Sequence, residues 1–231
     1  MPEPSALRVR LVAGRLARVR ERVAQAASRA GRTDDVAILL AAKTSPVEAI
    51  RAALGAGASL IGENRVQELV AKAPGLADLP HETHLIGPLQ RNKARAAAAH
   101  AQCIETVADL RLAQRLSDVA ARDLSVMIQV NTSGEATKSG CDPDHALDLA
   151  VATAAIPHLR VTGFMTIGLN STDVRAVAQS YARLRAIRDA AISGGLPAAR
   201  HLSMGMSGDL EIAIAQGATI VRVGSAVFGS R

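Results

Sequence analysis

Lys43 stands where a short apolar run, residues 36–42, meets the sequence Thr44-Ser45-Pro46. An apolar run of this length followed by helix-start residues is typical of a buried strand that leads into a helix. Partial burial at the strand end would cost the charged amine its solvation and favour the neutral, nucleophilic form. We therefore predict a half-buried Lys43 that forms a Schiff base, although a lysine that reaches past a strand end into solvent would give the same pattern.

Two turns rich in glycine and serine follow apolar runs near the C-terminus, at residues 203–208 and at Gly224-Ser225. An eight-stranded α/β barrel often binds a phosphate with the loops after strands seven and eight and with a helix N-terminus. We predict that Ser203 to Ser207 supply hydroxyls and a helix N-cap, and that Gly224 lets the backbone approach a phosphate. Ordinary strand-to-helix turns prefer the same residue types.

Arg222 lies two residues before Gly224. Both residues therefore face the same side of a strand. A fixed cation at this place, a lysine on the first strand and two phosphate-binding turns together suit an aldehyde carried by a phosphorylated pyridine ring. Lys43 would take the aldehyde, the turns the phosphate, and Arg222 the ring nitrogen. A salt bridge at the rim is the alternative for Arg222.

The remaining sequence alternates short apolar strands with helices. The strands are rich in Val, Ile and Leu with little alternation, which is typical of a parallel sheet buried on both faces. Eight such units predict a single-domain (β/α)8 TIM barrel over residues 36–231, and an open doubly wound sheet is the alternative. The predicted strands are 36–42, 59–62, 84–87, 103–106, 125–131, 161–166, 200–203 and 219–224. The predicted helices are 46–56, 64–72, 91–99, 109–121, 142–154, 173–193, 207–216 and a short one near 225.

An amphipathic helix is predicted before the barrel, within residues 1–31, with Leu7, Leu11, Val19 and Val23 on its apolar face. The whole chain of 231 residues, 48% of them hydrophobic, suits one domain. We expect no membrane span, no metal site and two reduced cysteines in a cytoplasmic protein. The net charge of +6 comes from scattered arginines, and aromatic residues make up only 1%. Nucleic acid is therefore not an expected partner.

The chain resembles the pyridoxal phosphate homeostasis protein family, single-domain relatives of the alanine racemase barrel. The matching stretches run from about residue 36 to the end, and they are Ala42-Lys43-Thr44, residues 62–68, residues 84–93, residues 133–140, residues 163–167, residues 202–207 and residues 221–229. The resemblance implies that pyridoxal 5′-phosphate (PLP) forms a covalent aldimine with Lys43. It also implies further cofactor-binding residues: Asn64 over the cofactor, Arg222 at the pyridine nitrogen, and Ser203, Met206, Ser207, Gly224 and Ser225 around the phosphate.

Catalysis is not expected, because a two-base racemase needs a tyrosine opposite its lysine. The only tyrosine, Tyr181, has the spacing of a helix core face. We therefore predict a monomeric protein that buffers PLP or delivers it to apo-enzymes. An amino-acid racemase or lyase, a phosphosugar barrel enzyme and a nucleic-acid-binding module are the alternatives. The loop 132–144 is predicted to cover the pocket mouth, with Lys138 either a second amine for transfer or a structural lysine.

Overall fold

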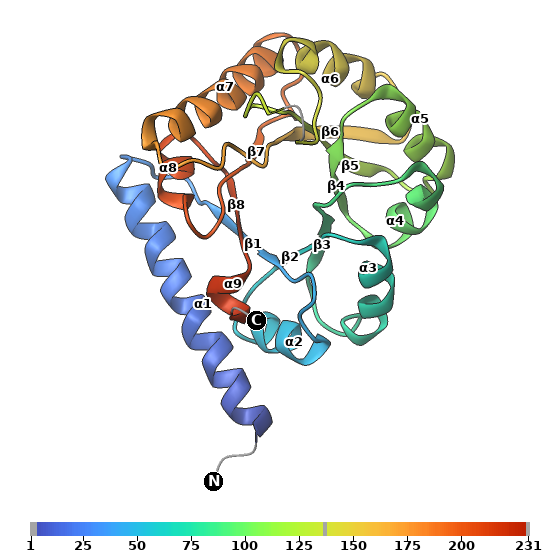
Figure 1. The fold of residues 1–231 in the computed structure, drawn as a ribbon. Coiled ribbons are helices and arrows are strands. Elements are labelled where there is room, and N and C mark those ends of the chain that lie inside the picture. Colours follow the sequence, from blue (N-terminus) through green and yellow to red (C-terminus); the bar gives the residue numbers. More distant parts are fainter. Residues whose placement is uncertain (1–3, 136–137, 230–231) are drawn as a thin grey trace.

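Eight parallel strands close into a barrel in the computed structural model, which describes residues 4–135 and 138–229 (Figure 1). Each strand pairs with the next along the chain, and the last pairs with the first. The strands are β1 (Ala37–Ala41), β2 (Leu60–Glu63), β3 (Glu82–Leu85), β4 (Cys103–Val107), β5 (Leu124–Gln129), β6 (Leu159–Met165), β7 (His201–Ser203) and β8 (Ile220–Val223). The closed order confirms the (β/α)8 prediction and excludes the open sheet.

Helices surround the barrel and connect successive strands (Figure 1). The first helix, α1 (Pro4–Arg29), precedes the barrel as an additional element. The others are α2 (Val47–Gly55), α3 (Val66–Lys72), α4 (Ala94–His100), α5 (Leu110–Val119), α6 (Ala146–Ala154), α7 (Val174–Ser193), α8 (Leu210–Ala215) and α9 (Ser225–Phe228). Short 3-10 turns cover Ala73–Gly75, Arg91–Lys93 and Pro143–His145. None of the helices among the described residues is long and apolar enough to cross a membrane.

The buried side chains form two apolar clusters, one between the barrel and its helices and one inside the barrel. The outward faces of the strands pack against the helices in one large aliphatic cluster. The inward faces form a second, small cluster around Leu39, Cys103, Met127, Met165 and Ile220. These residues fill the middle of the barrel, and the polar groups at the carboxyl ends of the strands lie around its rim.

The helix α1 packs along the outside of the barrel against α2, α8 and α9. Its buried face consists of Val12, Leu16, Val19, Val23 and Ala26. The predicted face was therefore only half right, because Leu7 and Leu11 are 52% and 50% exposed. The spacing of the apolar residues is compatible with a buried face that includes Leu7 and Leu11 or with one that includes Val12 and Leu16. The packing against the neighbouring helices buries the face with Val12 and Leu16.

Several predicted boundaries differ from the structure by one to four residues, and two of them bear on the rim. The third strand was expected at residues 84–87 and is observed at Glu82–Leu85. The helix after β7 was expected from residue 207 but begins at Leu210, so Ser207 is not its N-cap. Ser207 and Gly208 instead form a turn between β7 and α8. This longer connection leaves more backbone free at the rim.

Gly87 lies just after β3, where a Cβ atom would clash with the backbone of Asn64. Backbone on both sides leaves nothing flexible to move away, so Gly87→Ala should lower the free energy of unfolding by about 2–4 kcal/mol. The matched control is Gly14→Ala on α1, where a Cβ atom meets nothing within 4 Å. Helix propensity predicts a gain of about 0.5–1 kcal/mol there. Urea unfolding of both variants checks the pair, and equal effects would contradict the close packing at Asn64.

Candidate cofactor site at the carboxyl end of the barrel

Lys43 lies in a turn two residues after β1, at the rim formed by the carboxyl ends of the strands. Its side chain is exposed, so the prediction of a half-buried lysine was wrong. The amine lines an open cavity of about 940 Å³ together with Asn64, which follows β2, and Pro88, Gln90 and Lys93, which follow β3. The structure thus brings Lys43 and Asn64 to the same cavity.

A second lysine fixes the backbone that carries Lys43. Nζ of Lys72 on α3 donates to the carbonyl oxygens of Lys43 at 2.7 Å and of Ala42 at 3.4 Å. The same ammonium group pairs with Glu63 at 2.8 Å and Glu68 at 3.2 Å. These contacts hold the strand end in place while leaving the Lys43 amine open to the cavity.

Glu63 is almost fully buried at the end of β2, and its Oε2 atom has no hydrogen-bond partner among the described residues. Burial raises the pKa of Glu63 to about 7, although the hydrogen bond and charge of Lys72 act in the opposite direction. A carboxylate with one unsatisfied oxygen is costly to bury, which explains the preference for the neutral form.

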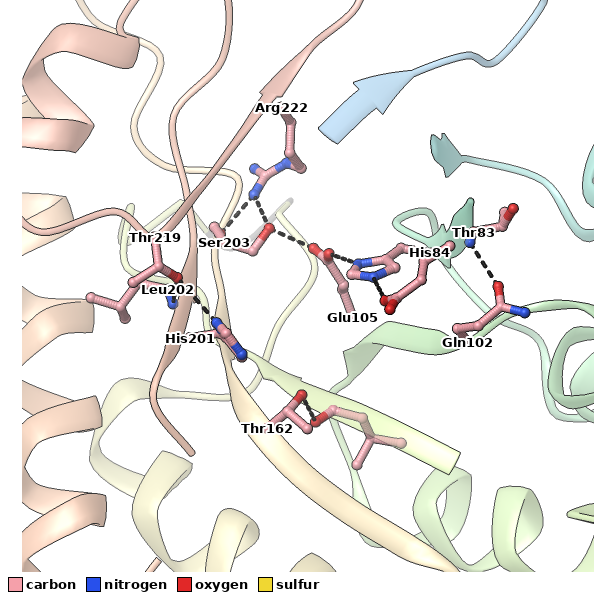
Figure 2. Close-up of polar contacts among 12 residues, drawn as sticks. Thr83, His84, Gln102, Glu105, Thr162, His201, Leu202, Ser203, Thr219 and Arg222 are labelled. Atoms are coloured by element: carbon pink, nitrogen blue, oxygen red, sulfur yellow. Dashed lines mark hydrogen bonds and ion pairs between the residues drawn. The ribbon is translucent and has the colours of Figure 1, made fainter. Parts of the chain in front are cut away.

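Arg222 enters the barrel interior from β8 and is buried (Figure 2). Its Nη1 atom donates to the carbonyl oxygen of Ser203 at 2.6 Å and to Oγ of Ser203 at 3.0 Å, and its Nη2 atom donates to the carbonyl oxygen of Thr166 at 2.7 Å. The Nε atom donates to no described residue. Arg222 is therefore fixed by both terminal nitrogens, and its Nε–H and one Nη2–H have no acceptor among the described residues.

Glu105 and His84 continue this chain of contacts through the interior (Figure 2). Oγ of Ser203 donates to Oε2 of Glu105 at 2.5 Å, and Nδ1 of His84 lies 2.6 Å from Oε1 of the same carboxylate. Burial opposes the charge on both groups. The pairing with Glu105 and Glu82 nevertheless raises the pKa of His84 to about 9, and the hydrogen bond from His84 keeps the pKa of Glu105 below its ordinary value.

The predicted phosphate turns lie on neighbouring strands. Gly224 lies against the end of β1. A Cβ atom added to Gly224 would be 3.1 Å from the carbonyl oxygen of Ala41. Ser225 begins α9 directly after it, and the amide nitrogens of Ser225 and Ala226 have no backbone acceptor within the described part of the chain. The same holds for Ser207 in the turn after β7. These free donors suit an anion.

Other predicted residues take different positions around these turns. Ser203 is completely buried. Its hydroxyl donates to Glu105 and accepts from Arg222, so it helps to hold the Arg222 side chain in position. Its place beside a phosphate stays a prediction. Met206 is 43% exposed at the tip of the turn. The turn itself is fastened by Asp209, which accepts from the Met206 amide at 2.6 Å.

Tyr181 lies in the core, as its helical spacing predicted. Its side chain is completely buried, and its hydroxyl donates to Asp209 at 2.6 Å. Burial and the neighbouring Asp209 raise the pKa of Tyr181 far above its ordinary value. The hydroxyl therefore stabilises the turn after β7 and holds its proton.

The loop after β5 is tied to its surroundings by Lys138. Nζ of this lysine donates to the carbonyl oxygen of Gly168 at 2.8 Å and pairs with Glu135 at 2.8 Å. These contacts favour the structural reading of Lys138 over a transfer amine. The loop was predicted to span 132–144 and cover the pocket mouth, and its residues 136–137 lie outside the described part of the chain.

Sequence reasoning did not assign roles to Glu105, Glu63 or Lys72. A signal for Glu105 was present, because an acidic residue stands in the middle of the apolar run Cys103-Ile104-Glu105-Thr106-Val107. A charge at such a position must find partners inside the protein. Lys72 gave no such signal, since a lysine in the last turn of a helix is common on protein surfaces.

The fold and this site define a class of protein. The family model for the alanine racemase N-terminal domain matches residues 15–231 of the chain. A pyridoxal phosphate homeostasis protein of Pseudomonas aeruginosa is 44% identical over 224 residues, which make up 95% of this chain and 96% of that protein. The chain therefore belongs to the pyridoxal phosphate homeostasis protein family, as the sequence motifs indicated.

Two solved structures share the fold closely. A protein of unknown function from Bifidobacterium adolescentis superposes with a TM-score of 0.93 at 38% identity, covering 99% of this chain and 97% of that one. PipY of Synechococcus elongatus, solved with PLP bound, superposes with a TM-score of 0.81 at 32% identity, covering 94% of this chain and all of that one. The similarity extends over nearly the whole chain in both cases.

The raised pKa of Glu63 predicts a pH dependence of stability. An acid whose pKa rises from 4.5 to about 7 on folding binds its proton more tightly in the folded state. The free energy of unfolding should therefore fall by about 2 kcal/mol between pH 5.5 and pH 8 through this group alone. Glu63→Gln should remove this part of the pH dependence, as measured by urea unfolding at both pH values. Glu68→Gln, which also touches Lys72, is the control and should leave it in place.

Proposed function

We propose that this protein binds PLP reversibly and takes part in PLP homeostasis by holding the cofactor and releasing it. The observation that carries this proposal is an amine, Lys43, at an open cavity on the rim of the barrel, after a strand that pairs with β8, which carries Arg222 and leads to Gly224. The relatedness to pyridoxal phosphate homeostasis proteins and the PLP-bound PipY structure support the same ligand.

The residues present fit PLP by the chemistry of their donors. The exposed amine of Lys43 suits an aldehyde and would hold it through a covalent imine bond. The free Nε–H of Arg222 suits an unprotonated ring nitrogen. The unpaired amides of Ser207, Ser225 and Ala226 suit a phosphate.

The remaining predicted residues would complete this site. Asn64 would lie over the ring, Met206 and Gly224 would border the phosphate, and Ser203 would keep Arg222 in position. PLP itself supplies the electrophilic aldehyde and a ring that accepts electrons. An arginine at the ring nitrogen leaves that nitrogen unprotonated, so the ring withdraws electrons less strongly than it would beside a carboxylate.

We further propose that the protein has no efficient catalytic activity of its own. A racemase needs a second acid–base group on the opposite face of the substrate. Tyr181 does not supply it, because its hydroxyl is buried against Asp209. The exposed position of Lys43 also leaves the cavity open to water, which suits exchange better than the water exclusion that catalysis favours.

The proposed function also includes an oligomeric state, a domain organisation and a cellular compartment. We infer a monomer, with residues 1–231 acting as one PLP-binding domain in which α1 (within residues 1–31) supports the barrel (residues 36–231). We place it in the cytoplasm, where PLP-dependent apo-enzymes would receive the cofactor. An open cavity supports such transfer, because the cofactor would leave without a large rearrangement of the barrel.

The absorption spectrum tests whether Lys43 is the residue that forms the imine with PLP. Wild-type protein mixed with PLP should show a visible imine band, and borohydride should attach the cofactor to Lys43 permanently, as peptide mass spectrometry would detect. Lys43→Ala should lose the band and the attachment. Lys93→Ala, which removes another amine from the same cavity, should retain both. Attachment to a different lysine would contradict the assignment.

The absence of efficient catalysis is tested with the PLP-loaded protein. Alanine and other amino acids should show no racemisation or elimination above the rate of free PLP with lysine, as followed by chiral chromatography. A true racemase treated identically is the positive control. Turnover that Lys43→Ala abolishes would make the racemase or lyase alternative correct.

A further inference from the structure

A continuous chain of polar contacts crosses the barrel interior from β8 to β3 (Figure 2). It starts at Arg222, passes through Oγ of Ser203 to Glu105, and continues to Nδ1 of His84. Nε2 of His84 then lies 3.7 Å from Oε2 of Glu82. The side chains of Arg222, Glu105 and His84 are all buried, whereas the Glu82 side chain is 63% exposed.

The two ends of this chain of polar contacts lie towards opposite ends of the barrel. Arg222 lies near the carboxyl ends of the strands, beside the candidate cofactor site. His84 and Glu82 line a separate opening of about 750 Å³, formed by residues at the amino ends of the strands, such as Ala37 and Ile220. The contacts therefore connect the candidate cofactor site with the opposite surface of the protein.

The buried part of this chain of polar contacts contains more positive than negative groups when His84 is protonated. A protonated His84 contacts the carboxylate of Glu105 directly, and Arg222 reaches the same carboxylate through Oγ of Ser203. Two like charges on one buried anion influence each other strongly, because the interior screens them poorly. The opening beside His84 carries further titratable or charged groups, which are Asp35, Glu82, Cys103, Arg122, Asp123, Arg160, Arg200 and His201.

We propose that Glu105 is a positioning residue for Arg222, and that the charge on His84 controls how strongly Arg222 attracts a bound cofactor. This inference rests on the proposed PLP function. When His84 carries a proton, it neutralises part of the Glu105 charge, and the positive potential of Arg222 at the ring nitrogen and the phosphate is high. When His84 loses its proton, Glu105 acts on Arg222 alone, and that potential falls.

The consequence is that PLP affinity depends on a proton held at the far side of the barrel. His84 is placed to lose that proton near pH 9. The PLP dissociation constant should therefore rise by about threefold or more between pH 8 and pH 10 through His84 alone. A threefold change is about 0.7 kcal/mol, a modest coupling for charges within one buried network.

The experiment measures the PLP dissociation constant at pH 8 and pH 10 in wild type, His84→Gln and Thr162→Val. All pH effects that do not involve position 84 are common to the three proteins, so the comparison isolates His84. His84→Gln should bind PLP about threefold more weakly at pH 8 and should lack the His84-dependent rise at pH 10. Thr162→Val is the matched control, because Thr162 lines the same opening as His84 and its hydroxyl donates to the Val126 carbonyl. It should behave like wild type.

A second measurement uses PLP-free protein and does not depend on the cofactor. The nitrogen-15 resonance of Arg222 Nε should move with pH as His84 titrates in wild type and in Thr162→Val, but not in His84→Gln. In Glu105→Gln, the His84 titration should move to lower pH by at least about one unit, because its main partner is gone. If Glu105→Gln does not fold, the His84→Gln comparison alone decides.

The outcomes separate the two proposals. Wild-type protein that does not bind PLP overturns the proposed function. Protein that binds PLP with the same pH dependence in wild type and His84→Gln overturns the coupling between His84 and Arg222 and leaves the proposed function standing. A rise of the PLP dissociation constant with pH and a pH-dependent shift of the Arg222 resonance that are both absent only in His84→Gln support the coupling.

Discussion

The burial of one guanidinium group, that of Arg222, constrains the interior of this barrel. The chain contains 1% aromatic residues, so its core consists mainly of aliphatic side chains, which provide no hydrogen-bond acceptor or opposite charge for a cation. A buried cation is tolerated only when hydrogen bonds and an opposite charge compensate for its lost hydration. The carbonyl oxygen of Thr166, both oxygens of Ser203 and the carboxylate of Glu105 meet this need. Four strands, β4, β6, β7 and β8, are thereby tied to one point in the interior.

The rim shows the complementary arrangement around Lys43. Its backbone is fixed by Lys72, whereas its amine stays exposed at an open cavity. A rigid backbone limits the entropy lost when a ligand binds, and an open cavity leaves the bond accessible to water and to competing amines. The combination favours a protein that holds an aldehyde reversibly. An enzyme on the same barrel would need a second acid–base group and a closed cavity, so the shared fold does not settle the chemistry.

These two regions meet where the barrel closes. The strand β1 carries Lys43 and pairs with β8, which carries Arg222 and leads to Gly224 and Ser225. Leu39 and Arg222 are 183 positions apart in the sequence (222 − 39), and they become neighbours because the last strand pairs with the first. The closure also explains why α1 packs against α2, α8 and α9, since the first and last units of the barrel lie side by side (Figure 1).

The sequence by itself determined the eight repeated strand–helix units, the position of Lys43 after the first strand, and the glycine and serine turns after the last two. Each of these depends on a local pattern of apolar residues and turn residues, which the sequence shows directly. Only the tertiary structure decided that Lys43 is exposed, that Ser203 faces Arg222, and that Glu105 pairs with His84. Exposure and pairing depend on which distant segments pack around a side chain, and the register of a closed barrel sets those neighbours.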